Sequence, residues 1–304
     1  MLGEVFYWVF NMSIAATICM VPILLLRRIK KIPRRFFLWL WLIPLIRMCI
    51  PVGISGRYGI MTLLSQFTTK TVTVYQVREL PPLTMVNIFM GAKSYFPITY
   101  KVNLLEKLFK TASVIWLSVA LASILTLVII YSVTQREMKD ARHWKENLYL
   151  SDRIRTPAVY GILKPRIILP IEYTTQNLTH ILAHERAHIK RKDNFIRLFS
   201  FAVVCLHWFN PMAWLMLKLL CADIELACDE AVLSTYNETQ RREYAHTLLS
   251  SAEKTNVFTA SFGGSRIRTR IDRILSYKKI SLCSGIACSA LILTIFYILL
   301  TNAS

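Results

Sequence analysis

Two histidines and a glutamate in the stretch ILAHERAHIKRKD, residues 181–193, have the types and spacing of a metal site. His184 and His188 are four residues apart, so on a helix both imidazoles extend from one face toward a single cation. Glu185 can reach a water on that cation without binding the metal itself. Zinc lowers the pKa of bound water toward neutrality, and a carboxylate takes the proton as the water attacks a carbonyl. The pattern therefore predicts zinc-assisted peptide hydrolysis, with Glu185 as the general base.

A catalytic zinc needs a third protein ligand and keeps its fourth position open. The best candidate is Glu225 in ADIELACDEAVL, which we expect to form a second helix beyond an apolar segment. Asp229 follows one turn later, faces the same site and can orient a ligating histidine through its other ring nitrogen. Three alternatives for the third position stay open, namely Asp229 itself, Glu230 and His246.

These residues also have plainer interpretations. The motif helix can be a solvated helix with polar histidines, and Glu225 and Asp229 can form an acidic helical face. His180 lies one turn before His184, but we interpret it as an ordinary polar residue because three ligands already complete a catalytic site. Asp193 is either an acid that supports the site from the helix end or a solvated aspartate.

The chain that positions this site has the composition of a membrane protein. Of its 304 residues 54% are hydrophobic, and the mean hydropathy is +0.42. Crossing a hydrocarbon core takes about 20 apolar residues. Four stretches qualify, with Arg47 as the only charge inside them: Val5 to Leu26, Phe36 to Ile54, Ala112 to Thr134 and Ile280 to Leu300. We therefore expect a mainly α-helical protein with four transmembrane helices, in which Arg47 faces protein or water.

The basic residues predict the orientation of these spans. Of the 37 Lys and Arg, six lie in RRIKKIPRR, residues 27–35, and 23 lie between the third and fourth spans, but only seven lie between the second and third. Short basic loops stay in the cytoplasm. Both termini and residues 55–111 should therefore be external. This distribution argues against direct nucleic-acid binding despite the net charge of +19. The basic residues of the motif helix are expected to face the cytosol and to contact the headgroups of membrane lipids; they are Arg186, Lys190, Arg191 and Lys192.

We accordingly divide the chain into three parts. Residues 1–135 hold three spans, residues 136–279 form a cytoplasmic zinc metalloprotease domain with a small β element, and residues 280–304 hold the fourth span and a short external tail. The first span is expected to stay as an anchor, because no basic residue precedes it and no cleavage site follows it. The seven cysteines are interpreted as packing residues.

Local patterns predict the elements of the middle part. TQREMKDARHWKEN should be a helical connector, and TPAVYGILKPRIILP a strand pair whose RIILP strand is a candidate edge for holding substrate. The motif helix should begin at Thr174 or Thr175. The apolar residues 195–220 should form a helical hairpin broken at Asn210-Pro211, because a single crossing would separate the two halves of the zinc site.

Five segments in a fixed order resemble a known family. They are PAVYGILKPRIILP, ILAHERAHIKRKDN, HWFNPMAWLM, ELACDEAVL and FGGSRIRTRIDRIL, and together they cover about half the chain. The chain resembles the membrane zinc metallopeptidases of the Bla/Mec type, the sensor-transducers that induce β-lactam resistance in Gram-positive bacteria.

This resemblance implies a gluzincin-like zinc site with His184, His188 and Glu225 as ligands, Glu185 as base and Asp229 behind them. It also implies a protein of the bacterial cell membrane that relays an external signal by cleaving a cytosolic transcriptional repressor. Family members also cut themselves.

In this sequence the self-cleavage segment falls within residues 256–270, with Ser261, Phe262 and Gly263 as candidates. Members that sense β-lactams carry a penicillin-binding domain after the fourth span, whereas this sequence ends at LLTNAS. The stimulus therefore stays open, as does the choice between a shortened chain and a member without a sensor.

Two further interpretations are weighed against the membrane endopeptidase. A signalling scaffold would use a closed, structural zinc site, and a housekeeping membrane metalloprotease would share the helix motif and the downstream glutamate. The full set of peptidase residues favours the endopeptidase. Assembly as a homo-oligomer is left open.

Overall fold

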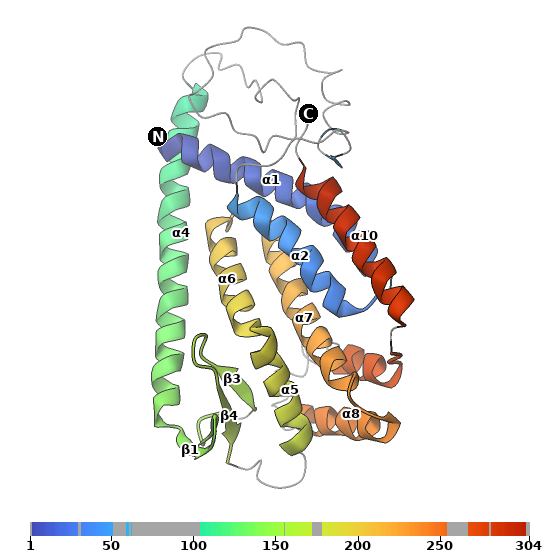
Figure 1. The fold of residues 1–304 in the computed structure, drawn as a ribbon. Coiled ribbons are helices and arrows are strands. Elements are labelled where there is room, and N and C mark those ends of the chain that lie inside the picture. The colour runs from blue at the N-terminus through green and yellow to red at the C-terminus, as the bar shows by residue number, and fades with distance from the viewer. Residues whose placement is uncertain are drawn as a thin grey trace.

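The computed structural model describes residues 2–29, 32–50, 59–60, 62, 104–154, 156–171, 178–253, 267–279 and 281–301. Its helices form a bundle, with a small sheet beside the lower part of one long helix (Figure 1). The first residues of α1 and the last of α10 lie at the same end of this bundle. The candidate self-cleavage residues Ser261, Phe262 and Gly263 lie outside the described residues.

Within these residues, three helices are long and apolar enough to cross a membrane. They are α1 (Leu2–Arg27), α4 (Leu104–Glu137) and α10 (Leu282–Leu300), and they match the first, third and fourth expected spans. The helix at the second expected span, α2 (Arg34–Cys49), has only 16 residues. Residues 51–54, to which this span was expected to extend, lie outside the described part of the chain.

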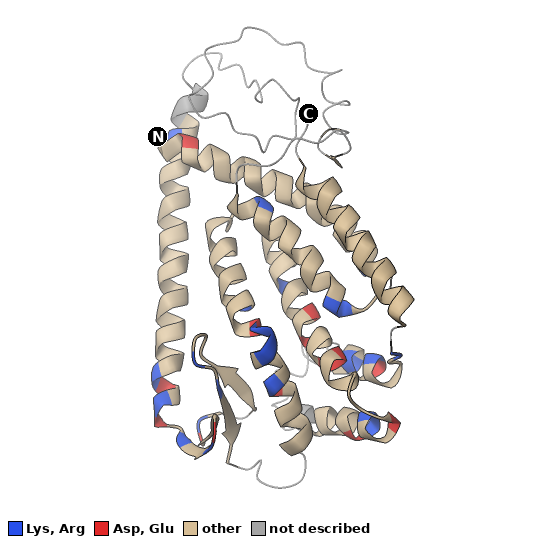
Figure 2. Ribbon diagram, viewed as in Figure 1, with Lys and Arg blue, Asp and Glu red and all other residues tan. Residues whose placement is uncertain are grey.

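The core of the bundle surrounds α2. Phe37 and Trp41 of α2 are fully buried against residues of α1, α10 and the two helices of the apolar hairpin, α6 (Asp193–Leu206) and α7 (Pro211–Leu233). The hairpin is therefore part of the same hydrophobic core as the candidate spans. Charged residues concentrate in the lower half of the view, at the lower end of α4, around the sheet and on α5, α8 and the lower part of α7 (Figure 2).

The predicted break at Asn210-Pro211 is confirmed. The Asn210 side chain accepts a hydrogen bond from the Met212 N–H at 2.9 Å, and Pro211 occupies the first turn of α7, where a missing N–H costs nothing. Asn210 also donates to the Ser13 hydroxyl of α1 at 2.8 Å, which fixes the hairpin tip in the bundle. The expected second helix is not separate. Since no Gly or Pro lies between Pro211 and Leu233, α7 runs unbroken over this range and carries Glu225.

Arg47 of α2 faces protein, as expected. It is 2% exposed, and its guanidinium donates to the carbonyl oxygens of Leu299 at 2.9 Å and Thr301 at 2.9 Å. These carbonyls lie at the C-terminal end of α10, where no helical N–H is left to satisfy them. These hydrogen bonds from Arg47 thus hold the end of α10 against α2.

The sheet has four strands in the order β1-β2-β4-β3. The predicted strand pair is confirmed as β3 (Ala158–Tyr160) and β4 (Arg166–Pro170), which are antiparallel, and β4 also pairs in parallel with β2 (Leu148–Ser151). The interpretation of RIILP as an edge strand is wrong, because β4 is flanked on both sides. The edge on that side is β3.

The expected helical connector is only partly helical. α4 continues into a 3-10 turn, η1 (Met138–Asp140), and the chain then forms β1 (Arg142–Lys145). The antiparallel partner of β1 is β2. Pairing with a strand that follows only a few residues later overrides the helical tendency of this charged stretch.

Candidate metal centre

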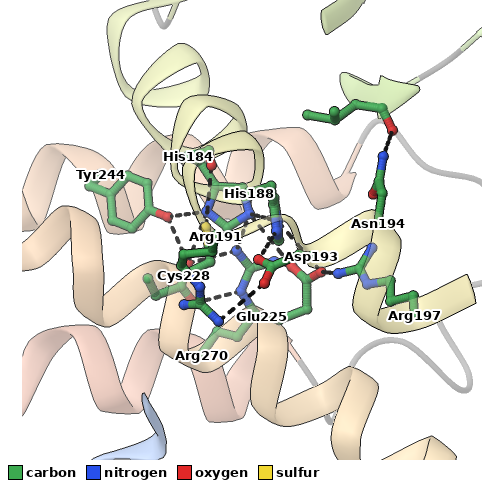
Figure 3. Close-up of polar contacts among 12 residues, drawn as sticks. His184, His188, Arg191, Asp193, Asn194, Arg197, Glu225, Cys228, Tyr244 and Arg270 are labelled. Carbon is green, nitrogen blue, oxygen red and sulfur yellow. Dashed lines mark hydrogen bonds and ion pairs between the residues drawn. The ribbon is translucent and has the colours of Figure 1, made fainter. Parts of the chain in front are cut away.

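The two motif histidines meet on one face of α5 (Leu178–Arg191). Their Nε2 atoms lie 3.1 Å apart, and both residues are buried (Figure 3). The expected starting residues of this helix, Thr174 and Thr175, lie outside the described residues. The four-residue spacing therefore places two imidazole nitrogens in position for a single ion.

Glu225 of α7 approaches the same point. Its Oε2 is 3.5 Å from Nε2 of His184, and its Oε1 is 3.7 Å from Nε2 of His188. Zinc bonds of 2.0–2.1 Å in a tetrahedron separate their ligand atoms by roughly 3.3 Å. The three side chains therefore fit one zinc ion.

The charges around this point suit a cation. Burial alone would raise the pKa of Glu225, but the hydrogen bond to His184 and the charge of Arg270 hold it well below its usual value. Burial would lower the pKa of His184, yet its contacts with Tyr244 and Asp229 raise it well above 6.5. A divalent ion would replace the protons that these imidazoles hold.

The outer nitrogen of His184 is held by a chain of hydrogen bonds. Its Nδ1 lies 2.8 Å from the Tyr244 hydroxyl, which donates to Oδ1 of Asp229 at 2.6 Å. Arg270, on the helix at 267–275, donates to both carboxylate oxygens of Asp229 at 2.8 Å. These contacts orient the ring and set which nitrogen faces Glu225.

The outer nitrogen of His188 has its own acidic partner. Its Nδ1 lies 2.7 Å from Oδ2 of Asp193, which is fully buried. Lys192 adopts a left-handed conformation, with φ of 57°, and this turns the chain from α5 into α6. Asp193 is therefore the first residue of α6 and supports the imidazole across the helix junction.

Glu185 lies on the wall of a cavity of about 250 Å³ that both histidines and Glu225 also line. Residues 156–159 at the start of β3 form another wall. Burial raises the pKa of Glu185, and the neighbouring histidines oppose this rise. A carboxylate with a raised pKa beside an open metal position is suited to act as a general base.

Cys228 offers a different third donor. Its Sγ lies within 4.8 Å of ligand atoms of His184 and His188, so these three could also hold an ion. The thiol is already engaged, however, because it donates to the backbone carbonyl of His184 at 3.2 Å. The carboxylate of Glu225 faces the two Nε2 atoms directly.

The other candidates lie elsewhere. Glu230 accepts hydrogen bonds from the N–H groups of Arg34 and Arg35, so it caps the start of α2. His246 is exposed on α8 (Glu238–Glu253). His180 lies 3.0 Å from the Tyr236 hydroxyl, apart from the imidazole pair.

Sequence reasoning missed three residues at this site. They are Tyr244, which contacts His184, and Arg270 and Arg197, which both form ion pairs with Glu225. Arg270 lies in FGGSRIRTRIDRIL, a segment that was singled out only as part of the resemblance. Tyr244 has no local signal, because only the fold brings α8 against α5.

Comparison with known families decides the family. The model of the BlaR1 peptidase M56 family matches residues 7–274, which is most of the chain. The chain belongs to this family. The resemblance to the Bla/Mec type is thereby confirmed. Together with the apolar helices, membership supports a membrane regulatory metallopeptidase.

Individual relatives match over shorter stretches. The chain is 30% identical to the regulatory protein BlaR1 of Bacillus licheniformis over 151 residues, 46% of this chain and 25% of the relative. It is 29% identical to a methicillin resistance mecR1 protein of Staphylococcus aureus over 103 residues, 33% of this chain and 18% of the relative. The matched part is therefore a quarter or less of each of these two proteins.

Proposed function

We propose that this protein is a zinc endopeptidase of the bacterial cell membrane. The observation that carries the proposal is the convergence of His184, His188 and Glu225 within 3.7 Å of one another, on the wall of a cavity shared with Glu185. A site with three protein ligands leaves a position for water, as catalytic zinc sites do.

Each group of residues at the site has a separate role in hydrolysis. His184, His188 and Glu225 would hold the zinc ion, which would supply Lewis acidity to the scissile carbonyl and lower the pKa of the attacking water. Glu185 accepts the proton of that water and delivers it to the leaving amine. Asp229 and Asp193 keep the two imidazoles turned toward the metal.

The free edge of β3 is the place where an extended substrate would lie. Residues 156–159 line the cavity, and among the strands of the described residues β3 pairs with β4 alone. A peptide added beside β3 would form main-chain hydrogen bonds next to the metal. β3 thus takes the role that the sequence suggested for RIILP.

The topology proposed with this activity has four spans, with α2 as the second, both termini external and the metal centre cytoplasmic. The basic loop at residues 27–35 supports this orientation. The substrates would be a cytosolic repressor, by analogy with the family, and the chain itself between Ser261 and Gly263. The curated relatives are named for regulation and for methicillin resistance.

The test uses the purified chain reconstituted in vesicles with zinc. Glu185→Gln should keep one zinc per chain but lose self-cleavage by about a hundredfold or more, because only the base is removed. His188→Ala should lose both zinc and cleavage. Fragments are measured by mass spectrometry, with the parental chain as reference.

Two results would argue against the endopeptidase. Cleavage of Glu185→Gln at the parental rate would refute the assigned base. Retained zinc with no fragments from the parental chain, together with signalling that survives Glu185→Gln, would favour the scaffold.

A further inference from the structure

The turn between β3 and β4 exposes a large apolar side chain. Leu163 is 95% exposed, the highest exposure among the exposed large hydrophobic residues that the structure describes. The turn consists of residues 161–165, GILKP, and Lys164 beside Leu163 is also exposed. A single exposed leucine is common on protein surfaces. Here the neighbouring residues indicate what Leu163 contacts.

The turn is fastened to the start of α6. The side-chain amide of Asn194 donates to the carbonyl oxygens of Val159 at 2.8 Å and Gly161 at 3.3 Å (Figure 3). Asn194 immediately precedes Phe195, so the first residue of the turn lies beside the first turn of α6. The position of α6 therefore determines where the turn begins.

One face of α6 belongs to the core of the membrane bundle. Val203 and Val204 are buried together with α1, α2 and α7. Nearer the start of α6, Phe195 is 54% exposed and Phe199 is 45% exposed, and their rings stack 6.2 Å apart. Two stacked, exposed phenylalanines on a helix that packs among candidate spans form an apolar surface of the kind that contacts lipid.

The turn has a conformation that only glycine adopts easily. Gly161 has φ of +90°, and a Cβ atom there would lie 2.8 Å from the carbonyl oxygen of Lys164. Pro165 follows and restricts the exit from the turn. The turn between β3 and β4 therefore has a defined conformation, and it lies at the end of the sheet nearer the bundle (Figure 1).

We propose that the turn at residues 161–165 inserts Leu163 into the acyl region of the bilayer beside α6. The occupant is lipid because Asn194 holds the start of the turn next to the exposed Phe195 of α6, and because only 17% of the apolar window of α4, the candidate span that leads into the sheet, is buried. Lys164 extends its ammonium group to the phosphates at the membrane surface.

This contact has a consequence that rests on the proposed function. β3 ends at the turn and lines the cavity with residues 156–159, so its free edge opens close to the membrane surface. Substrate segments held near the membrane would reach β3 more readily than segments free in solution. The membrane contact itself does not depend on catalysis.

The test measures the depth of a fluorophore at residue 163. Leu163→Cys is made in a chain whose accessible cysteines Cys49, Cys221, Cys283 and Cys288 are changed to serine, because the others are buried. The labelled protein is reconstituted in vesicles that contain phospholipid with a nitroxide on the acyl chain. Ile130→Cys on α4, 59% exposed, is the matched lipid-facing control, and Glu238→Cys on α8 is the water-facing control.

We expect the label at residue 163 to lose fluorescence to the acyl-chain nitroxide as the α4 label does, whereas the α8 label does not. Quenching at residue 163 that equals the α8 value would overturn the proposal. Lys164→Cys provides a second variant in case labelling at residue 163 disturbs the turn. Its label should respond to a headgroup nitroxide more than to the acyl-chain nitroxide, and equal insensitivity to both would also refute the insertion.

Discussion

The guanidinium of Arg27 and the carboxylate of Asp223 form two hydrogen bonds, each 3.0 Å long. Arg27 is the last residue of α1, and Asp223 lies on α7 two residues before Glu225. Asp223 is fully buried and also accepts a hydrogen bond from the indole of Trp41 on α2 at 2.9 Å. The helix that carries the acidic metal ligand is thus tied directly to the first two helices of the bundle.

Removing Asp223 should destabilise the bundle strongly. Asp223→Ala leaves the Arg27 charge without its partner and the Trp41 N–H without an acceptor, so we expect a loss of about 3 kcal/mol in unfolding free energy. Thermal unfolding in detergent measures it. Glu238→Gln is the control, because its pair with Arg242 is exposed and should matter little. Equal unfolding temperatures for Asp223→Ala and the parental protein would show that the Arg27–Asp223 pair does not contribute to stability.

The Tyr244 hydroxyl should matter for metal affinity. Tyr244→Phe removes the hydrogen bond to His184 and the one to Asp229 while keeping the ring, so zinc affinity should fall about 10- to 100-fold. Competition with a chromogenic chelator measures the affinity. Tyr236→Phe is the matched control, since its hydroxyl contacts His180 instead. A similar loss in both variants would mean that the effect is not specific to the site.

Zinc affinity and the stability of the metal-free protein should depend on pH in opposite directions. Burial alone would lower the pKa of His188, but the hydrogen bonds to Asp193 and Cys228 raise it from 6.5 to about 9. Protonated His188 therefore stabilises the metal-free fold below pH 6.5, and this contribution is lost as the pH rises through about 9. Zinc needs the neutral ring, so its affinity should rise over the same interval.

Unfolding of the metal-free protein and zinc titrations across this interval measure both trends. Asp193→Asn removes the charged partner, so both transitions should move toward pH 6.5. If the parental protein bound zinc equally well at both ends of the interval, proton competition at His188 would be excluded.

The sequence predicted the elements whose signals are local. The motif helix, the hairpin break at Asn210 and the strand pair around Lys164-Pro165 follow from spacing, helix capping and turn chemistry. The position of β4 inside the sheet could not be predicted, because β2 pairs with it from a separate segment. Tyr244 was missed for a similar reason, since only tertiary packing brings α8 to His184.

The continuity of α7 was also misjudged. Its composition changes from apolar to acidic near Asp223, and the part that carries Glu225 was expected to be a separate helix beyond the apolar segment. A change in composition marks a change in surroundings but does not break a helix, and no breaker lies between Pro211 and Leu233. Glu225 is therefore positioned by a helix whose first half packs in the hydrophobic core of the bundle.

The central claim is that one zinc ion is held by His184, His188 and Glu225 with a position left for water. X-ray absorption at the zinc edge of the purified, zinc-loaded protein tests it most directly. We predict a shell of nitrogen and oxygen atoms only, at about 2.0–2.1 Å. The shell should lose an oxygen ligand in Glu225→Gln and stay unchanged in Cys228→Ser. A zinc–sulfur distance of about 2.3 Å would instead place Cys228 in the site and contradict the catalytic centre described above.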